Sequence, residues 1–130
     1  MMLVTQKSSR SYDDTVAALS EAVKGKQDWR VLSVNDYQKS TAAFAKLERV
    51  GSVTICNPRY ASRILGDPAD RRVTAFMPLG IGVYEDKAGQ VYVSQLNVGL
   101  MGMMFGGTIA DVMGSAGKDL DSIVATVAAK

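Results

Sequence analysis

The sequence predicts an α+β fold in a single domain over residues 1–130, with a mostly antiparallel sheet and helices packed on one face. Segments 73–85 and 90–97 are rich in β-forming residues and flank the polar turn 86–89, a pattern typical of a β-hairpin. Apolar residues recur at helical spacing near both ends of the chain. Hairpin-linked strands cannot all be parallel, so we expect helices over one face of an antiparallel sheet.

The composition is that of a folded protein and argues against two classes of partner. Hydrophobic residues make up 47% of the chain and charged residues 22%, whereas disordered chains are less apolar and more charged. The formal net charge of +2 is too small for the broad positive field that binds phosphate backbones, so we expect no nucleic-acid partner. No segment approaches the roughly 20 apolar residues that span a bilayer, so we expect no membrane partner.

The cysteine content and the first residues predict a cytoplasmic location. A single cysteine cannot form an intramolecular disulfide, so the chain does not require an oxidising compartment. Residues 1–7 lack the apolar stretch and the small-residue cleavage site of a signal peptide. The cytoplasm is therefore the expected compartment.

The first quarter of the chain predicts a strand and a helix. Residues 3–5 suit a short strand. Ser11, with Asp14 three residues later, resembles a capping box, and Val16, Leu19 and Val23 follow at helical spacing. We expect this helix to end at the Gly25 region, where flanking lysines favour a C-terminus.

The middle of the chain predicts two strands separated by a short helix. Residues 29–34 are rich in β-formers with imperfect alternation, which indicates a strand covered on both faces. Apolar residues within 41–50 suggest a short helix that Gly51 closes. A compact strand at 52–56 then precedes Asn57-Pro58, where asparagine caps a helix and proline occupies its first position. That helix should end near residues 66–68, at a glycine and a proline.

The hairpin contains an irregular point and an open area. Pro78 lacks an amide hydrogen, so it implies a bulge, a break or an edge position. Gly80 and Gly82 should share a face with Tyr84, which leaves a notch beside an aromatic ring. We expect another group to approach the sheet closely there.

The last third begins with a glycine-rich apolar segment. Four glycines within residues 98–107 predict a flexible segment. A helix restarts at Thr108, and Leu120, Ile123 and Val127 mark its buried stripe toward Lys130.

Five blocks in this chain resemble the family called domain of unknown function 302. They are ICNPRYA at 55–61, MP at 77–78, VYE at 83–85, VYVS at 91–94 and GLMG at 99–102. The resemblance extends over most of the chain from Tyr12. It implies an α+β domain of the β-α-β-sheet-α type, with a layout similar to TATA-binding-protein-like folds, and it suggests a homodimer. It implies no activity. Many members carry a second cysteine after the proline that corresponds to Pro78; Leu79 stands there in this chain, which argues against a cysteine pair.

Cys56 and the helix start beside it form the first candidate site. The helix amides and Arg59 would lower the pKa of the Cys56 thiol and favour a thiolate. The alternative is that Cys56 packs as a small buried hydrophobe. The same helix start, with Arg59 and Arg63, could hold a phosphate or a carboxylate, and the alternative is that both arginines are simply solvated.

Three methionines form the second candidate site. Met101, Met103 and Met104 are soft ligands that, with Cys56, could bind copper(I) or haem iron. The chain has no histidine, so we expect neither a metal nor a cofactor, and the methionines would instead fill a core or a subunit contact. Without histidine there is no His-based triad either, and no catalytic residue is assigned.

The sequence favours a non-catalytic binding or sensing module that acts as a homodimer and holds a small apolar or anionic ligand between the sheet and residues 99–107. The expected ligand-binding residues are Cys56, Asn57, Arg59, Tyr60, Gly80, Gly82, Tyr84, Met101, Met104 and Phe105. The alternatives are a thiol-based redox or soft-metal protein centred on Cys56, and a structural protein with a large apolar dimer contact.

Overall fold

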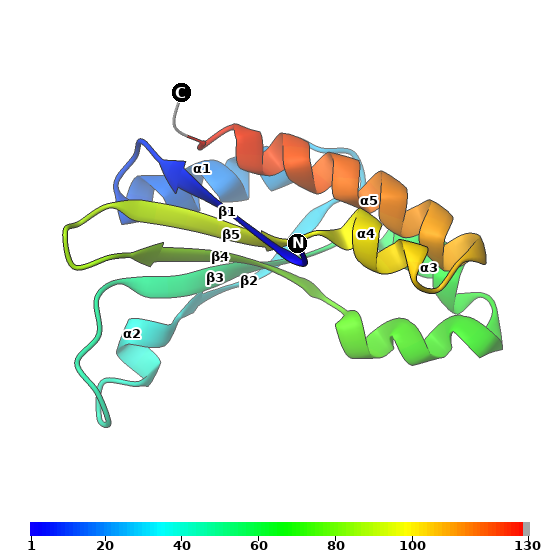
Figure 1. Ribbon diagram of the computed structural model, residues 1–130, viewed down its shortest axis with the longest axis horizontal. Coiled ribbons are helices and arrows are strands. Elements are labelled where there is room, and N and C mark those ends of the chain that lie inside the picture. The colour runs from blue at the N-terminus through cyan, green and yellow to red at the C-terminus, as the bar shows by residue number, and fades with distance from the viewer. Residues whose placement is uncertain (129–130) are drawn as a thin grey trace.

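The chain forms a five-stranded antiparallel sheet covered by helices, in a computed structural model that describes residues 1–128 (Figure 1). The strands lie in the order β1-β5-β4-β3-β2. Every neighbouring pair is antiparallel, which confirms the predicted α+β class. The strands are β1 (Leu3–Ser8), β2 (Arg30–Asp36), β3 (Val50–Cys56), β4 (Leu79–Glu85) and β5 (Val91–Leu96).

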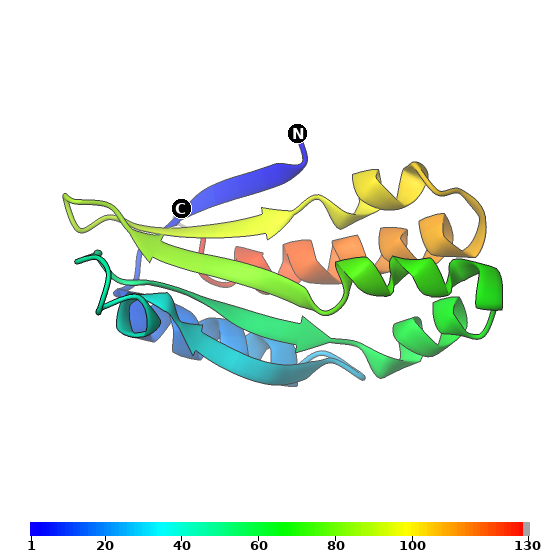
Figure 2. The same ribbon diagram turned by 90° about the horizontal axis from the view of Figure 1, so that it is seen from below.

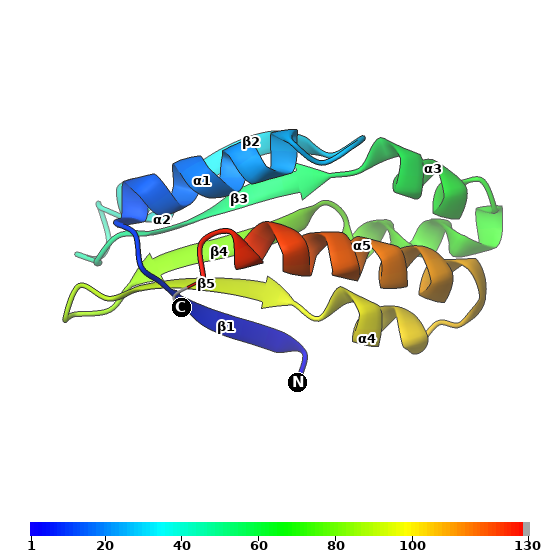
Figure 3. The ribbon, with the colours of Figure 1, turned by 90° about the horizontal axis from the view of Figure 1, so that it is seen from above.

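The longer helices cover one face of the sheet. Helices α1 (Tyr12–Lys24) and α5 (Gly107–Ala125) lie on this inner face, as Figures 1 and 3 show. The short helix α4 (Val98–Met103) packs beside α5, and α3 (Pro58–Leu65) follows the end of β3. No helix within residues 1–128 is long and apolar enough to cross a membrane.

The main core lies between the sheet and these helices. Alternate residues of the central strands point toward the helices, so Val53, Ile81 and Val93 are fully buried. They meet the apolar stripes that were predicted for α1 and α5. The apolar residues of α1 and α5 that are buried most deeply are Leu19, Val23, Val112, Leu120, Ile123 and Val124. Residues 129 and 130, to which the predicted last helix extended, lie outside the described residues.

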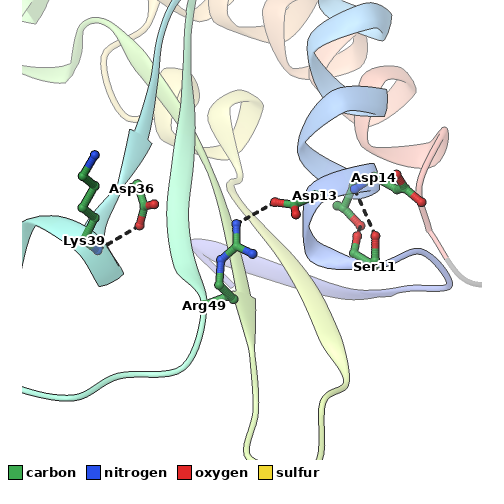
Figure 4. Close-up of polar contacts among 7 residues, drawn as sticks. Ser11, Asp13, Asp14, Asp36, Lys39 and Arg49 are labelled. Atoms are coloured by element: carbon green, nitrogen blue, oxygen red, sulfur yellow. Dashed lines mark hydrogen bonds and ion pairs between the residues drawn. The ribbon is translucent and has the colours of Figure 1, made fainter. Parts of the chain in front are cut away.

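Polar contacts fix the start of α1 against the sheet (Figure 4). Ser11 Oγ accepts a hydrogen bond from the amide of Asp14 at 3.1 Å, which confirms the predicted cap. Arg49, just before β3, donates to Asp13 Oδ1 at 2.6 Å, and this bond lowers the pKa of the Asp13 carboxyl. The Arg49 guanidinium also lies 4.3 Å from the centre of the Tyr12 ring.

The predicted hairpin is confirmed, and its notch is open. Asp86 Oδ1 accepts hydrogen bonds from the amides of Ala88 and Gln90, which closes the turn between β4 and β5. Gly80 and Gly82 alternate along β4 with the buried Ile81 and Val83, so they face the side of the sheet away from the core. Figure 2 shows the sheet from this side, with α1 and α5 behind it. No atom lies within 4 Å of the position that a Cβ on Gly80 would occupy.

The predicted helix at 41–50 is wrong, and the helix that forms is shorter and earlier. Helix α2 (Tyr37–Ser40) is capped by Asp36, whose Oδ1 accepts from the Lys39 amide at 3.0 Å (Figure 4). It lies on the outer face, where Tyr37 Oη is 3.3 Å from Ser52 Oγ. Phe44 is 93% exposed and Leu47 is 39% exposed, so the apolar side chains of residues 41–49 bury too little surface to stabilise a short helix.

The strand predicted at 73–85 starts six residues later. A 3-10 helix, η1 (Pro68–Phe76), occupies the first part of that segment, and β4 begins at Leu79. Asp67 accepts a hydrogen bond from the Ala69 amide at 3.0 Å, and Pro68 follows it. The glycine-proline signal at 66–68 therefore ends α3 as predicted and also starts η1.

The flexibility predicted for residues 98–107 is wrong, because most of the segment is helical. Its glycines allow α4 to approach α5 closely. A Cβ on Gly102 would lie 2.7 Å from the Met113 Cβ, and one on Gly117 would lie 3.0 Å from the Gly99 nitrogen. Gly99, Gly102 and Gly117 therefore form a tight helix contact, whereas no atom lies within 4 Å of a Cβ on Gly106 or Gly107. Helix α5 then begins at Gly107, one residue before the predicted start.

We expect Gly102→Ala to lower the free energy of unfolding by about 1 to 3 kcal/mol, because the added methyl group overpacks the α4–α5 contact. Gly114→Ala in α5 is the matched control. No atom lies within 4 Å of a Cβ there, so alanine should raise stability by about 0.4 to 1 kcal/mol. Urea denaturation of both variants measures the difference, and equal effects would contradict the tight contact.

Candidate functional site

An apolar pocket of about 70 Å³ lies where β3 ends and α3 begins. Its lining comes from both of these elements and from η1, β4 and α5. It includes Trp29, Ile55, Ile64, Val73 and Met113. The volume is about half of the roughly 150 Å³ cavity that holds benzene, so a short aliphatic group fits it.

The start of α3 positions one wall of this pocket. Asn57 Oδ1 accepts a hydrogen bond from the Tyr60 amide at 3.1 Å, and Pro58 occupies the first helical position, as predicted. The first turn then directs the Tyr60 ring toward Trp29. The two rings pack edge to face, with centroids 6.0 Å apart and planes at 83°.

One carboxylate from α5 holds both aromatic side chains. Asp119 Oδ2 accepts from Trp29 Nε1 at 2.9 Å and from Tyr60 Oη at 3.0 Å. Burial, together with the bond to Asp119, raises the pKa of Tyr60 above its ordinary value. Tyr60 therefore stays protonated at neutral pH and acts as a hydrogen-bond donor. Asp119 thus fixes two walls of the apolar pocket.

A polar pocket of about 250 Å³ adjoins the apolar one. The two pockets share Asn57 and Tyr60 in their linings. The rest of the polar lining is Lys26, Gln27, Asp28, Arg59 and Asp119. Asp28 has a φ of 66°, a left-handed conformation that few residues other than glycine adopt. The turn before β2 thereby contributes three neighbouring polar residues to one pocket.

The charges in the polar pocket are only partly paired. Arg59 Nε lies 3.4 Å from Asp28 Oδ2. Within residues 1–128, Lys26 and Asp119 have no partner of opposite charge within 4 Å. Asn57 is only 6% exposed, and its Nδ2 donates to no acceptor in the described part of the chain. The pocket therefore offers one cation, one anion and one amide donor to a ligand.

The structure brings four of the predicted site residues together. Cys56, Asn57, Arg59 and Tyr60 all contribute to this pair of pockets. Cys56 is half-buried and lines the apolar pocket. Arg63 does not join them, because it pairs with Asp111 of α5 at 3.0 Å.

The other predicted site residues lie elsewhere. Gly80 and Gly82 lie on the outer face of the sheet, and Tyr84 stacks on Tyr92 with ring centroids 5.2 Å apart. Phe105 packs against Phe76 at 5.8 Å. Neither pocket is lined by Gly80, Gly82, Tyr84 or Phe105, although Phe76 lines the apolar one.

The predicted soft-ligand set does not converge. Met101 is buried in the core, whereas Met103 and Met104 are 73% and 74% exposed. The methionines that share the apolar pocket with Cys56 are Met77 and Met113. Neither of the two pockets lies between the sheet and residues 99–107, where the sequence predicted the ligand. Of the glycine-rich segment, only Val98 lines the apolar pocket, because the glycines bind α4 to α5.

Sequence reasoning found Asn57, Arg59 and Tyr60 in the polar pocket but missed the rest of its lining. Lys26, Asp28 and Asp119 were not proposed as site residues, although Asp119 directly precedes the buried Leu120. A carboxylate at the edge of an apolar helical stripe is the one signal that could have indicated a buried hydrogen-bond acceptor. The left-handed turn at Asp28 has no comparable signal in the sequence.

Comparison with known proteins identifies the family. Residues 4–127 match the family described as domain of unknown function DUF302. The chain belongs to this family. The crystal structure of an uncharacterized conserved DUF302 protein from Bacillus stearothermophilus is similar, with 20% identity over 98% of each chain and a TM-score of 0.84. At that identity the likeness shows the shared fold. No curated protein matches this DUF302 chain.

We expect Asp119→Ala to lower the free energy of unfolding by about 2 kcal/mol, because it leaves the Trp29 and Tyr60 donors unpaired. Asp111→Ala removes an exposed carboxylate from the same helix and should change stability by less than about 1 kcal/mol. Urea denaturation followed by Trp29 fluorescence compares the two. A loss in Asp119→Ala no larger than in Asp111→Ala would show that Asp119 does not hold the pocket walls.

Proposed function

We propose that this DUF302 protein is a non-catalytic small-ligand-binding or sensing module that acts as a homodimer, with the apolar part of its ligand in the pocket beside Tyr60. The apolar pocket, whose aromatic walls Asp119 holds in place, carries the proposal. Concave apolar sites with a few fixed polar groups are typical of small-molecule binding. The raised pKa of Tyr60 keeps its hydroxyl protonated and bonded to Asp119, so its ring stays fixed as a pocket wall.

The single tryptophan reports on this pocket directly. Trp29 lines it, and the chain has no other tryptophan. We expect 3-methylbutan-1-ol, a short branched alcohol, to change Trp29 fluorescence saturably in the wild-type protein. In Ala116→Leu the added side chain fills the pocket, so the alcohol should bind at least about tenfold more weakly.

Two further variants make this test decisive. Ala125→Leu, on an exposed position of the same helix, should bind the alcohol as the wild type does. Ala61→Leu fills the pocket from the half-buried side of α3, where overpacking is milder, and should weaken binding as Ala116→Leu does. A linear, unsaturable response, or equal binding in all four proteins, would contradict the proposed site.

A different outcome would favour the alternative centred on Cys56. This cysteine shares the apolar pocket with Met77 and Met113, so a thiol-based redox or soft-metal function would use the same place. Thiol alkylation as a function of pH separates the two. If the alcohol leaves Trp29 unchanged and the thiolate forms well below the ordinary pKa of about 8.5, the thiol function replaces the ligand-binding one.

The outer edge of β2 supports the homodimer. Strand β2 ends the sheet, and Leu32 and Val34 on it are 55% and 56% exposed. Edge strands with exposed apolar side chains pair readily with another strand. Two antiparallel β2 strands related by a two-fold axis at Ser33 would place Arg30 of each copy opposite Asp36 of the other. The charges of this edge are therefore complementary to those of a second copy.

We expect Arg30→Asp and Asp36→Arg each to dissociate the dimer, because each places like charges opposite one another. The double variant R30D/D36R restores opposite charges and should restore the dimer, although it lacks the Asp36 cap of α2. Lys7→Asp on the opposite edge strand, β1, is the control and should leave the dimer intact. Native mass spectrometry reports subunit number and any retained ligand together. A monomeric wild type, or no rescue in the double variant, would contradict this interface.

A further inference from the structure

We infer that the ligand is a free α-amino acid with a short aliphatic side chain. Its side chain occupies the apolar pocket, and its ammonium and carboxylate groups bind in the adjoining polar pocket. This inference rests on the proposed ligand-binding function and names the chemical class that the site takes.

The first support is the position of the two pockets. They share Asn57 and Tyr60, so a molecule a few bonds long can reach both. In an α-amino acid the two charged groups and the side chain leave the same carbon atom. That geometry matches an apolar pocket beside a polar one, whereas a long-chain ligand would need a deeper apolar pocket than about 70 Å³.

The second support is the balance of free charges. Arg59 and Asp28 are paired with each other, which leaves Lys26 and Asp119 as the unpaired charges of the polar pocket. A carboxylic acid would meet Lys26 favourably and Asp119 unfavourably, and an amine would do the reverse. A zwitterion places an ammonium toward Asp119 and a carboxylate toward Lys26, so it satisfies both.

The third support is the unpaired amide of Asn57. Its Oδ1 caps α3, and its residue is more than nine-tenths buried, yet Nδ2 has no acceptor among the described residues. Within residues 1–128 the one fully buried side-chain nitrogen or oxygen atom without a hydrogen-bond partner is Gln95 Oε1, so Asn57 Nδ2 is accessible and free to donate to a ligand. Because Asn57 lines both pockets, a ligand carboxylate oxygen is well placed to accept from it.

The size of the apolar pocket limits the side chain. At about half of the volume that holds benzene, it takes the alkyl groups of valine or leucine and rejects the indole of tryptophan. Selectivity among amino acids should therefore follow side-chain volume.

The test compares L-leucine with two analogues that each lack one charged group. Removing the amino group gives 4-methylpentanoate, and removing the carboxylate gives 3-methylbutan-1-amine. By isothermal titration calorimetry, with Trp29 fluorescence as a second readout, we expect leucine to bind at least about tenfold more tightly than either analogue. Tryptophan should not bind.

A variant of Asp119 tests whether this carboxylate binds the ammonium group of the ligand. Asp119→Asn keeps an oxygen that can accept from Trp29 and Tyr60 but removes the negative charge. This variant should bind leucine at least about tenfold more weakly than the wild type does, and it should bind 4-methylpentanoate no more weakly. Asp111→Asn, on the exposed side of the same helix, is the matched control and should bind all three compounds as the wild type does.

The outcomes separate this inference from the function on which it rests. If 3-methylbutan-1-ol binds but leucine binds no better than its two analogues, the amino-acid inference is overturned and ligand binding in the pocket stands. Preference for 4-methylpentanoate or for the amine overturns it in the same way. If neither the alcohol nor leucine binds, the proposed function fails as well.

Discussion

The candidate site depends on the carboxylate of Asp119. Its Oδ2 joins α5 to Trp29, 90 positions earlier in the chain, and to Tyr60, 59 positions earlier. Hydrogen bonds to a carboxylate are stronger than hydrogen bonds between neutral groups, so Asp119 holds both donors firmly. Because both donors belong to aromatic rings, their bonds set the direction of two large apolar surfaces. One polar atom therefore determines the shape of an apolar pocket.

The position of Asp119 depends in turn on how α5 sits over the sheet. The glycine contacts between α4 and α5 bring their backbones closer than side chains would allow. Val98, at the start of α4, then reaches the apolar pocket, and the buried stripe of α5 stays on the sheet. Glycine normally weakens a helix, so its use here is a packing requirement at the expense of local propensity. A loosened α4–α5 contact would move Asp119 and the pocket walls together.

Local signals in the sequence predicted the fold well, and contact-dependent features were predicted poorly. The cap at Asn57, the cap at Ser11 and the hairpin turn at Asp86 each depend on residues within a few positions, so their physics is visible in the sequence. Residues 41–49 and 98–107 were misinterpreted, because exposure and helix contact decide their structure. The same contrast between local and long-range signals applies to the site. Residues around the Asn57 cap were found, whereas Trp29 and Asp119 act through a long-range bond.

The corner that holds both pockets is where the chain departs from its own local preferences. Asp28 adopts a left-handed backbone, Asn57 Nδ2 has no acceptor within residues 1–128, and Lys26 and Asp119 line one pocket without an oppositely charged partner there. The left-handed backbone of Asp28 costs free energy, and a folded chain tolerates it where surrounding structure holds it. The core between the sheet and the long helices does so without contributing to the polar pocket. A molecule that pairs those groups would bind the folded state alone and stabilise it, because the groups come together only when the chain is folded.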